Sequence, residues 1–172
     1  MNKNNIFGFT LEFIEDKCIE AGFPKYTAKQ IFNWLYKNNV NDFSQMSNIS
    51  KKQREDLEEN FILERYIPKT SIVSKDGTIK YLFTFSDNSS VETVFIPDND
   101  RNTVCISTQT GCKLACKFCM TGKIKQCRNL EVGEILSQIV SLPDFDKITN
   151  IVIMGMGEPL MNYENVFNAI KI

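Results

Sequence analysis

The sequence predicts an α/β fold, in which a small helical domain and a β-meander precede the first part of an α/β barrel or of a doubly wound sheet. Three observations predict it. The N-terminal third carries apolar residues at helical spacing, the middle is rich in β-branched and aromatic residues, and the last third alternates strand-like with helix-like segments. We expect a helical accessory domain over residues 1–66, a β-meander over 67–100 and the barrel segment over 101–172.

Start and stop signals define the helices of the first domain. Residues 10–22 place apolar side chains at helical spacing, and Gly22 is a plausible end of that helix. The motifs TAKQ at 27–30 and SKKQ at 50–53 both match the capping box, which predicts a helix beginning at each. These helices predict a compact module of about 60 residues.

The amino-acid composition changes near Pro68. From there to Pro97 the chain is rich in β-branched and aromatic residues, interrupted by the turn-forming sequences DG at 76–77 and DNS at 87–89. This pattern predicts three antiparallel strands joined by short turns.

Strands and helices then alternate. After Arg101 only about 70 residues follow, whereas a closed (β/α) barrel needs about 200 or more. We therefore expect this chain to hold the opening of a barrel and to be an incomplete, N-terminal portion. The expected elements are a strand at 103–108, a helix at 131–142, a buried parallel strand at 150–157 and a helix from 164.

Composition indicates a cytosolic protein. The chain has 172 residues and a net charge of −1, with neither an apolar run of roughly 18 residues nor a signal-peptide pattern at its N-terminus. Disulfide frameworks are rare in the reducing cytosol. We therefore expect the six cysteines of this chain to be a mixture of core thiols and a metal or redox site. No membrane association is expected.

Charge is unevenly distributed along the chain. Residues 101–130 contain no Asp or Glu, so this stretch is either a solvated basic loop or a landing surface for an anion such as RNA phosphates. The basic residues in it are Arg101, Lys113, Lys117, Lys123, Lys125 and Arg128.

Three cysteines are crowded into this basic stretch. Cys112, Cys116 and Cys119 have the spacing C-x3-C-x2-C. A structural zinc site normally has four Cys or His ligands, and the chain has no histidine, so zinc would need Cys105 or Cys127 as a fourth ligand. The triple suits a [4Fe–4S] cluster better, because three thiolates leave one iron open for a substrate or cofactor.

A family resemblance follows from these motifs. The cysteine triple with Phe118 before its last cysteine, the segment MGMGEP at 154–159 and the segment VETVFIP at 91–97 together resemble the RlmN and Cfr family of radical S-adenosylmethionine (SAM) RNA methyltransferases. The resemblance extends from about residue 80 to residue 172. It implies a radical SAM (β/α) barrel and methyl transfer to adenine C2 in 23S rRNA and tRNA, or to adenine C8 in a Cfr-like enzyme.

The resemblance also implies roles for individual residues. Cys112, Cys116 and Cys119 would hold the [4Fe–4S] cluster. Gly157 and Glu158 match the positions that contact SAM.

Two further residues match catalytic positions of the family. Glu92 matches the proton acceptor by the resemblance, whereas its place on a meander strand taken alone indicates a solvent-facing residue. Cys105 matches a cysteine that forms a transient disulfide with a methyl-carrying C-terminal cysteine, which this chain lacks; otherwise it would be a buried strand thiol. Cys18 and Cys127 match no role and are expected to be structural.

The expected partners are 23S rRNA, tRNA and an electron donor such as flavodoxin, with the protein acting as a monomer. Two alternatives stay open. One is a Cfr-like C8 methyltransferase, and the other is a non-enzymatic zinc-binding RNA module that uses the cysteine triple with Cys105 or Cys127.

Overall fold

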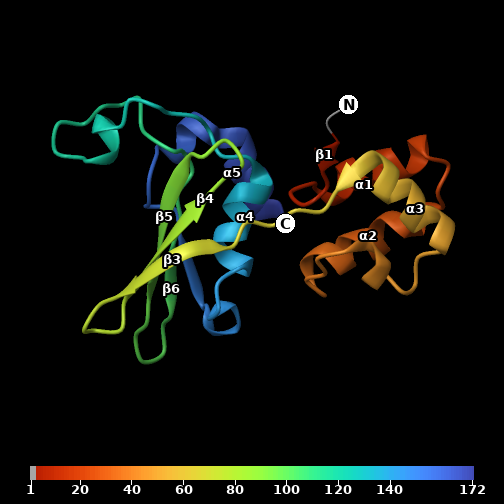
Figure 1. The fold of residues 1–172 in the computed structure, drawn as a ribbon, viewed down its shortest axis with the longest axis horizontal. Coiled ribbons are helices and arrows are strands. Elements are labelled where there is room, and N and C mark those ends of the chain that lie inside the picture. Colours follow the sequence, from red (N-terminus) through yellow and green to blue (C-terminus); the bar gives the residue numbers. More distant parts are fainter. Residues whose placement is uncertain (1–2) are drawn as a thin grey trace. The chain divides into compact units, whose positions relative to one another are not determined.

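The computed structural model describes residues 3–172, which form two compact units (Figure 1). One unit comprises the chain up to Arg65 together with Ile170–Ile172, and the other comprises Tyr66–Ala169. The expected three-part division stays a prediction. Within residues 3–172, no helix is both long and apolar enough to cross a membrane.

The first unit is helical, as predicted. Its short strands β1 and β2 pair in parallel, and three α-helices and one 3-10 helix make up the rest. The elements are β1 (Asn4–Asn5), α1 (Leu11–Glu20), α2 (Lys25–Tyr36), η1 (Phe43–Gln45), α3 (Lys51–Asn60) and β2 (Phe61–Ile62).

Two of the expected helix boundaries are confirmed. Thr10 caps α1 by accepting a hydrogen bond from the Phe13 backbone, and Gly22 follows that helix with φ +70°. The capping box at the start of α3 is present, because the Ser50 hydroxyl accepts from the Gln53 backbone and the Gln53 side chain accepts from the Ser50 backbone.

The predicted capping box at Thr27 is wrong. Helix α2 begins at Lys25 and places Thr27 inside its first turn, where that side chain is buried. Pro24 precedes the helix with φ −57°, a value close to the helical one that the proline ring imposes, and its side chain offers no cap.

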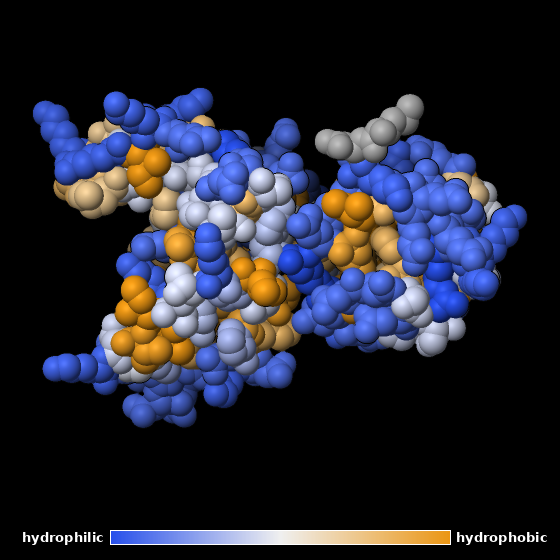
Figure 2. Space-filling model, in the orientation of Figure 1, coloured by the Kyte–Doolittle hydropathy of each residue, from blue (hydrophilic) through white to orange (hydrophobic). Residues whose placement is uncertain are grey.

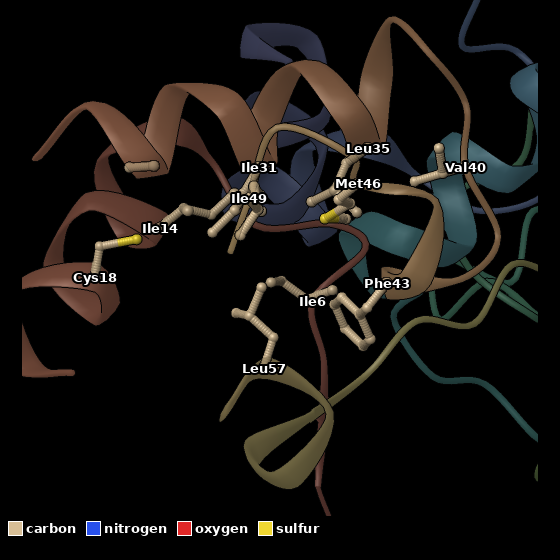
Figure 3. Close-up of a cluster of buried hydrophobic side chains, with 11 residues drawn as sticks. Ile6, Ile14, Cys18, Ile31, Leu35, Val40, Phe43, Met46, Ile49 and Leu57 are labelled. Carbon is tan, nitrogen blue, oxygen red and sulfur yellow. The ribbon is translucent and has the colours of Figure 1, made fainter. Parts of the chain in front are cut away.

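Apolar side chains from all three helices meet in the core of this unit (Figure 3). Cys18 belongs to that core, and burial raises the pKa of its thiol to about 11, as expected for a structural cysteine. The buried cluster consists of Ile6, Ile14, Cys18, Ala28, Ile31, Leu35, Val40, Phe43, Met46, Ile49 and Leu57.

The second unit contains a five-stranded mixed sheet in the order β3-β4-β5-β6-β7. The predicted meander is confirmed, since β3, β4 and β5 are consecutive antiparallel strands, and β6 pairs with β7 in parallel. The strands are β3 (Pro68–Val73), β4 (Ile79–Thr84), β5 (Ser90–Ile96), β6 (Thr103–Cys105) and β7 (Asn150–Val152).

The two faces of this sheet differ. Helices α4 (Val132–Val140) and α5 (Tyr163–Lys171) contribute to the core on one face, where Phe83 and Val104 are completely buried. Alternate residues point to the opposite face, which is more exposed and carries Glu92 and Cys105.

The parallel pairing of β7 is confirmed, but its predicted burial is wrong. Ile151 is 49% exposed, because β7 lies at the edge of the sheet and only β6 pairs with it within the described residues. An apolar run indicates burial only when both neighbours of a strand are present.

We expect Leu35→Ala to destabilise the helical unit by about 2–5 kcal/mol, because Leu35 is completely buried and its truncation leaves a cavity. Urea unfolding followed by the fluorescence of Trp34, the only tryptophan of the chain, measures this unit selectively. Ile19→Ala is the control, since Ile19 is 63% exposed and its loss should change the unfolding free energy by less than 1 kcal/mol or so. Equal losses in the two variants would contradict this assignment of the core.

Candidate functional site

The cysteine-bearing loop projects beyond the end of β6 (Figure 1, teal). Two backbone hydrogen bonds close its neck, from Thr110 to the Arg128 carbonyl and from Leu130 to the Thr108 carbonyl. The segments that enter and leave the loop are therefore held side by side at this neck, and residues 111–127 form the loop beyond it.

The three cysteines of the triple lie along this loop, each half-buried. Consecutive tight turns separate them, with Ala115 donating to the Cys112 carbonyl and Cys119 donating to the Cys116 carbonyl. Ala115 has φ +49°, a left-handed conformation that lets the chain reverse between the first two thiols. Within residues 3–172 no three Cys, Asp or Glu side chains lie close enough to hold one metal ion.

The donor chemistry of the loop fits a thiolate-held cluster. Hydrogen bonds from the Gly122 backbone and from the Thr121 hydroxyl and backbone lower the pKa of the Cys119 thiol. A lower pKa favours the thiolate, which is the form that ligates iron. A closed zinc site would need a fourth ligand as well.

The two candidate fourth ligands lie in different places. Cys127 lies next to Gly111, since a Cβ at Gly111 would be 3.2 Å from the Cys127 Cβ, and this brings it near the start of the triple. Cys105 lies on the sheet, where burial raises the pKa of its thiol and a hydrogen bond with the Met154 backbone lowers it. All cysteines in the described chain are free thiols.

A glycine-rich loop follows β7 and lies against residues 106–109, which lead into the cysteine loop. Gly155 donates to the Ile106 carbonyl at 3.0 Å, and a Cβ at Gly155 would be 2.7 Å from both that oxygen and the Ser107 Oγ. Gly157 has φ +95°, and a Cβ there would be only 2.5 Å from the Gln109 Cβ. Only glycine fits at these two positions, because the loop backbone lies too close to residues 106–109 to leave room for a Cβ.

Glu158 ends this loop and caps the 3-10 helix η4 (Pro159–Asn162). Its Oε1 accepts a hydrogen bond from the Leu160 backbone at 3.0 Å, while its own backbone N–H donates to Gln109 Oε1 at 2.9 Å. Gly157 and Glu158 are therefore held together in one ordered turn.

Glu92 and Cys105 both contact the glycine-rich loop. The Glu92 backbone N–H donates to the Met156 Sδ at 3.4 Å, and the Glu92 carbonyl accepts from Ser107 Oγ at 2.6 Å. Because the Cys105 thiol shares a hydrogen bond with the Met154 backbone, the same loop touches both predicted catalytic residues.

The Glu92 carboxylate itself is turned toward solvent. It pairs with Lys80 at 2.9 Å between Oε1 and Nζ, and the two side chains are 47% and 46% exposed. An exposed pair of this kind contributes little to stability. The carboxylate is thus accessible for proton transfer.

Sequence reasoning missed the buried polar residues that join these segments. Ser107 and Gln138 are both completely buried. Gln138 accepts from the Ser107 backbone and the Thr93 hydroxyl, and donates to the Ser107 and Glu134 carbonyls. The only available signal was a glutamine within the apolar pattern of α4, since such a side chain must find partners in the core.

The predicted anion-binding surface stays a prediction, but Arg128 differs from the other basic residues of this stretch. Arg128 is partly exposed, but its charge is paired: it lies 2.5 Å from Asp87 and 2.7 Å from Glu134, and over the Phe85 ring. Its side chain also donates to Ser89 Oγ, so it links the β4–β5 turn to α4.

The remaining charges of the loop are exposed. Figure 2 shows hydrophilic side chains around apolar ones on the projecting part of this unit. The apolar side chains include Phe118, which is 92% exposed, and Met120. The exposed lysines of the loop are Lys113, Lys117, Lys123 and Lys125.

Family comparisons agree with this arrangement of loops. The radical SAM superfamily model matches residues 106–172, which include the cysteine loop, the glycine-rich loop and α5. The model of the ribosomal RNA large subunit methyltransferase N-terminal domain matches residues 4–63, most of the helical unit.

Individual relatives match the whole chain. It is 46% identical over 172 residues to the probable dual-specificity RNA methyltransferase RlmN of Parabacteroides distasonis, covering all of this chain and 50% of that protein. It is 44% identical over 172 residues to the dual-specificity RNA methyltransferase RlmN of Geotalea uraniireducens, again covering all of this chain and 50% of that protein. The chain thus spans about half the length of these curated relatives.

A solved structure supports the same assignment. The crystal structure of a radical SAM methyltransferase from Sphaerobacter thermophilus superimposes with a TM-score of 0.85 and 38% identity, over 98% of this chain and 51% of that one. The fold and its two loops are those of a radical SAM protein. Within this class, the chain belongs to the RlmN family.

We expect Gly157→Ala to destabilise the second unit more than Gly22→Ala destabilises the first. Both glycines have positive φ, but only at Gly157 would a Cβ collide with Gln109, whereas nothing lies within 4 Å at Gly22. Placing alanine at a positive φ alone costs about 1 kcal/mol of stability at either position. A loss of stability clearly above that value for Gly157→Ala would therefore report the collision with Gln109. Urea unfolding by circular dichroism checks it, and equal losses would contradict the packing of this loop.

We expect Arg128→Met to destabilise the second unit by about 2–4 kcal/mol at pH 7, because it leaves the Glu134 carboxylate, which is 7% exposed, without its partner. The hydrogen bond from Arg128 holds the pKa of the Asp87 carboxyl well below its usual value. That part of the stability is present above the unfolded-state pKa of about 3.9 and is lost as pH falls through the lower folded-state value.

Urea unfolding of Arg128→Met and of the wild-type chain between pH 7 and pH 3 measures both effects. The difference between the two proteins should begin to narrow below about pH 4, because the unfolded wild type then takes up a proton at Asp87 that its folded form, with the lowered pKa, does not. Lys125→Met is a matched control on the same loop, since Lys125 is exposed. A difference that stays constant with pH would show that the ion pair contributes nothing.

Proposed function

We propose that this chain is part of a radical SAM RNA methyltransferase that transfers a methyl group to C2 of adenine in 23S rRNA and tRNA. The observation that carries the proposal is the convergence on one glycine-rich loop of Glu92, Cys105 and residues 106–109, which lead into the cysteine loop. The identity of 46% to a probable dual-specificity RNA methyltransferase over the entire chain supports it.

In this proposal Cys112, Cys116 and Cys119 hold a [4Fe–4S] cluster, and Gly157 and Glu158 contact SAM. When bound, the cluster and SAM supply radical and methyl-transfer chemistry, while the protein supplies position and shielding. The lowered pKa of Cys119 fits the first role. The ordered Gly157–Glu158 turn beside the neck of the cysteine loop fits the second.

Glu92 is the proposed proton acceptor and Cys105 the proposed thiol for a transient disulfide. A base is chemically sensible, because adding a carbon to an adenine ring eventually requires the loss of a ring proton. The exposed carboxylate of Glu92 can meet a substrate, and the Cys105 thiol lies on the same face of the sheet. The second cysteine of that disulfide would belong to a part of the family beyond these residues.

The exposed lysines of the cysteine loop are the proposed contacts for RNA phosphates. Lys113, Lys117, Lys123 and Lys125 are exposed around that loop, without a single Asp or Glu between residues 101 and 130. Arg128 is left out of this surface because its charge is already paired. An electron donor such as flavodoxin, a monomeric state and a cytoplasmic location belong to the same proposal.

A zinc-binding RNA module is the second candidate, and one observation favours it. Cys127 lies against Gly111 at the start of the triple, where it could supply a fourth thiolate. Cys105 is the poorer fourth ligand, because its thiol lies on the sheet beside the Met154 backbone. A Cfr-like methyltransferase acting on adenine C8 is a variant of the first proposal.

Anaerobic reconstitution of the chain with iron and sulfide tests the proposal. We expect about four irons per wild-type chain, a brown colour, and a spectrum that changes when SAM is added. We expect Cys116→Ala to load no cluster, while the Trp34 fluorescence of the helical unit is unchanged.

Two controls accompany this experiment. Cys18→Ala should retain full iron loading, because Cys18 is buried in the core of the helical unit. Cys127→Ala separates the two candidates, since it should lower metal content only if Cys127 is a zinc ligand. A colourless wild-type chain with one tightly held zinc would refute the proposed cluster.

A further inference from the structure

We propose that Gln109 is a positioning residue, whose side chain holds the Gly157–Glu158 turn against the neck of the cysteine loop and thereby shapes the SAM site. This inference rests on the proposed function for its ligand. Its structural part rests on contacts that need no cofactor.

The Gln109 carboxamide joins two segments that are far apart in the sequence. Its Oε1 accepts from the Glu158 backbone N–H at 2.9 Å, and its Nε2 donates to Asn129 Oδ1 at 2.7 Å. Gln109 enters the cysteine loop and Asn129 leaves it, and the two also form a β-bridge. One buried side chain therefore ties both sides of the neck to the glycine-rich loop.

The orientation of this amide follows from its partners. The Glu158 N–H can only donate, so the Gln109 oxygen must face it. The Met161 carbonyl can only accept, so Asn129 directs its Nδ2 there at 3.1 Å and keeps its Oδ1 for Gln109. Reversing either side-chain amide would break a hydrogen bond, so only one orientation of the two amides satisfies all three hydrogen bonds.

Packing adds to the hydrogen bonds. A Cβ at Gly157 would lie 2.5 Å from the Gln109 Cβ and 2.7 Å from the Gln109 backbone nitrogen. Gln109 therefore lies flat against Gly157 while it binds the next residue. The two residues proposed to contact SAM are consecutive, and Gln109 restrains both of them.

This arrangement predicts that losing the Gln109 side chain weakens SAM binding without changing iron loading. Gln109 is not one of the proposed cluster ligands, so its loss should leave iron loading unchanged. Loss of the carboxamide frees the Glu158 backbone and lets the turn sample other conformations, which lowers the population ready to bind. A residue that merely stabilised the unit would reduce iron loading and SAM affinity together.

The test compares Gln109→Met with Gln126→Met in the complete 172-residue chain. Methionine keeps the length of the side chain and removes both hydrogen bonds. Gln126 is an exposed glutamine of the same loop, so it provides the matched substitution. Hydrogen exchange of the Glu158 amide is measured by NMR in the cluster-free chain, and SAM affinity by calorimetry after reconstitution.

For Gln109→Met we expect the Glu158 amide to exchange about tenfold faster, and the SAM dissociation constant to rise about five- to tenfold, as for the loss of one hydrogen bond. Iron content should match the wild type, and Gln126→Met should change none of these quantities. Unchanged exchange at Glu158 would overturn the structural part, and unchanged SAM affinity despite faster exchange would overturn the positioning role.

The same experiment separates this inference from the proposed function. A wild-type chain that takes up iron and sulfide but binds no SAM would refute the SAM site and, with it, the ligand part of the inference. The exchange of the Glu158 amide would still decide whether Gln109 holds that turn, because it is measured without cluster or SAM.

Discussion

The second unit depends on the pairing of polar groups inside its core. Ser107 and Gln138 are fully buried, and their groups would be costly to leave without partners. Ser107 Oγ donates to the Glu92 carbonyl and accepts from the Met156 backbone, while Gln138 holds the Ser107 backbone from helix α4. The end of β6, strand β5, the glycine-rich loop and α4 are therefore joined through one residue.

The parallel pair β6–β7 explains where the site forms. Both strands run in the same direction, so the cysteine loop after β6 and the glycine-rich loop after β7 emerge at the same edge of the sheet. Ligands of α/β folds commonly bind at such carboxyl ends. Gly155 and Gly157 allow the two loops to touch, since any side chain there would collide with residues 106–109. The family assignment and the local geometry thus indicate the same region.

Local patterns predicted most of the secondary structure and failed where tertiary contacts decide. The capping box at Ser50 formed as its motif predicts. The similar motif at Thr27 did not, because the helix begins two residues earlier, at Lys25, directly after Pro24. The apolar run at Ile151 correctly indicated a strand. Whether such a strand is buried depends on whether other strands pair with both of its edges, and the local sequence does not show this.

The spacing of Cys112, Cys116 and Cys119 and the glycines of the MGMGEP segment were readable directly, because neighbouring residues within one loop define them. The basic charge at Arg128 was readable too, but not that Asp87 and Glu134 neutralise it. Nor could spacing show that Gln109 would bind the backbone of Glu158, 49 residues later. Such contacts depend on how strands align and helices pack over long sequence separations, so only the folded chain specifies them.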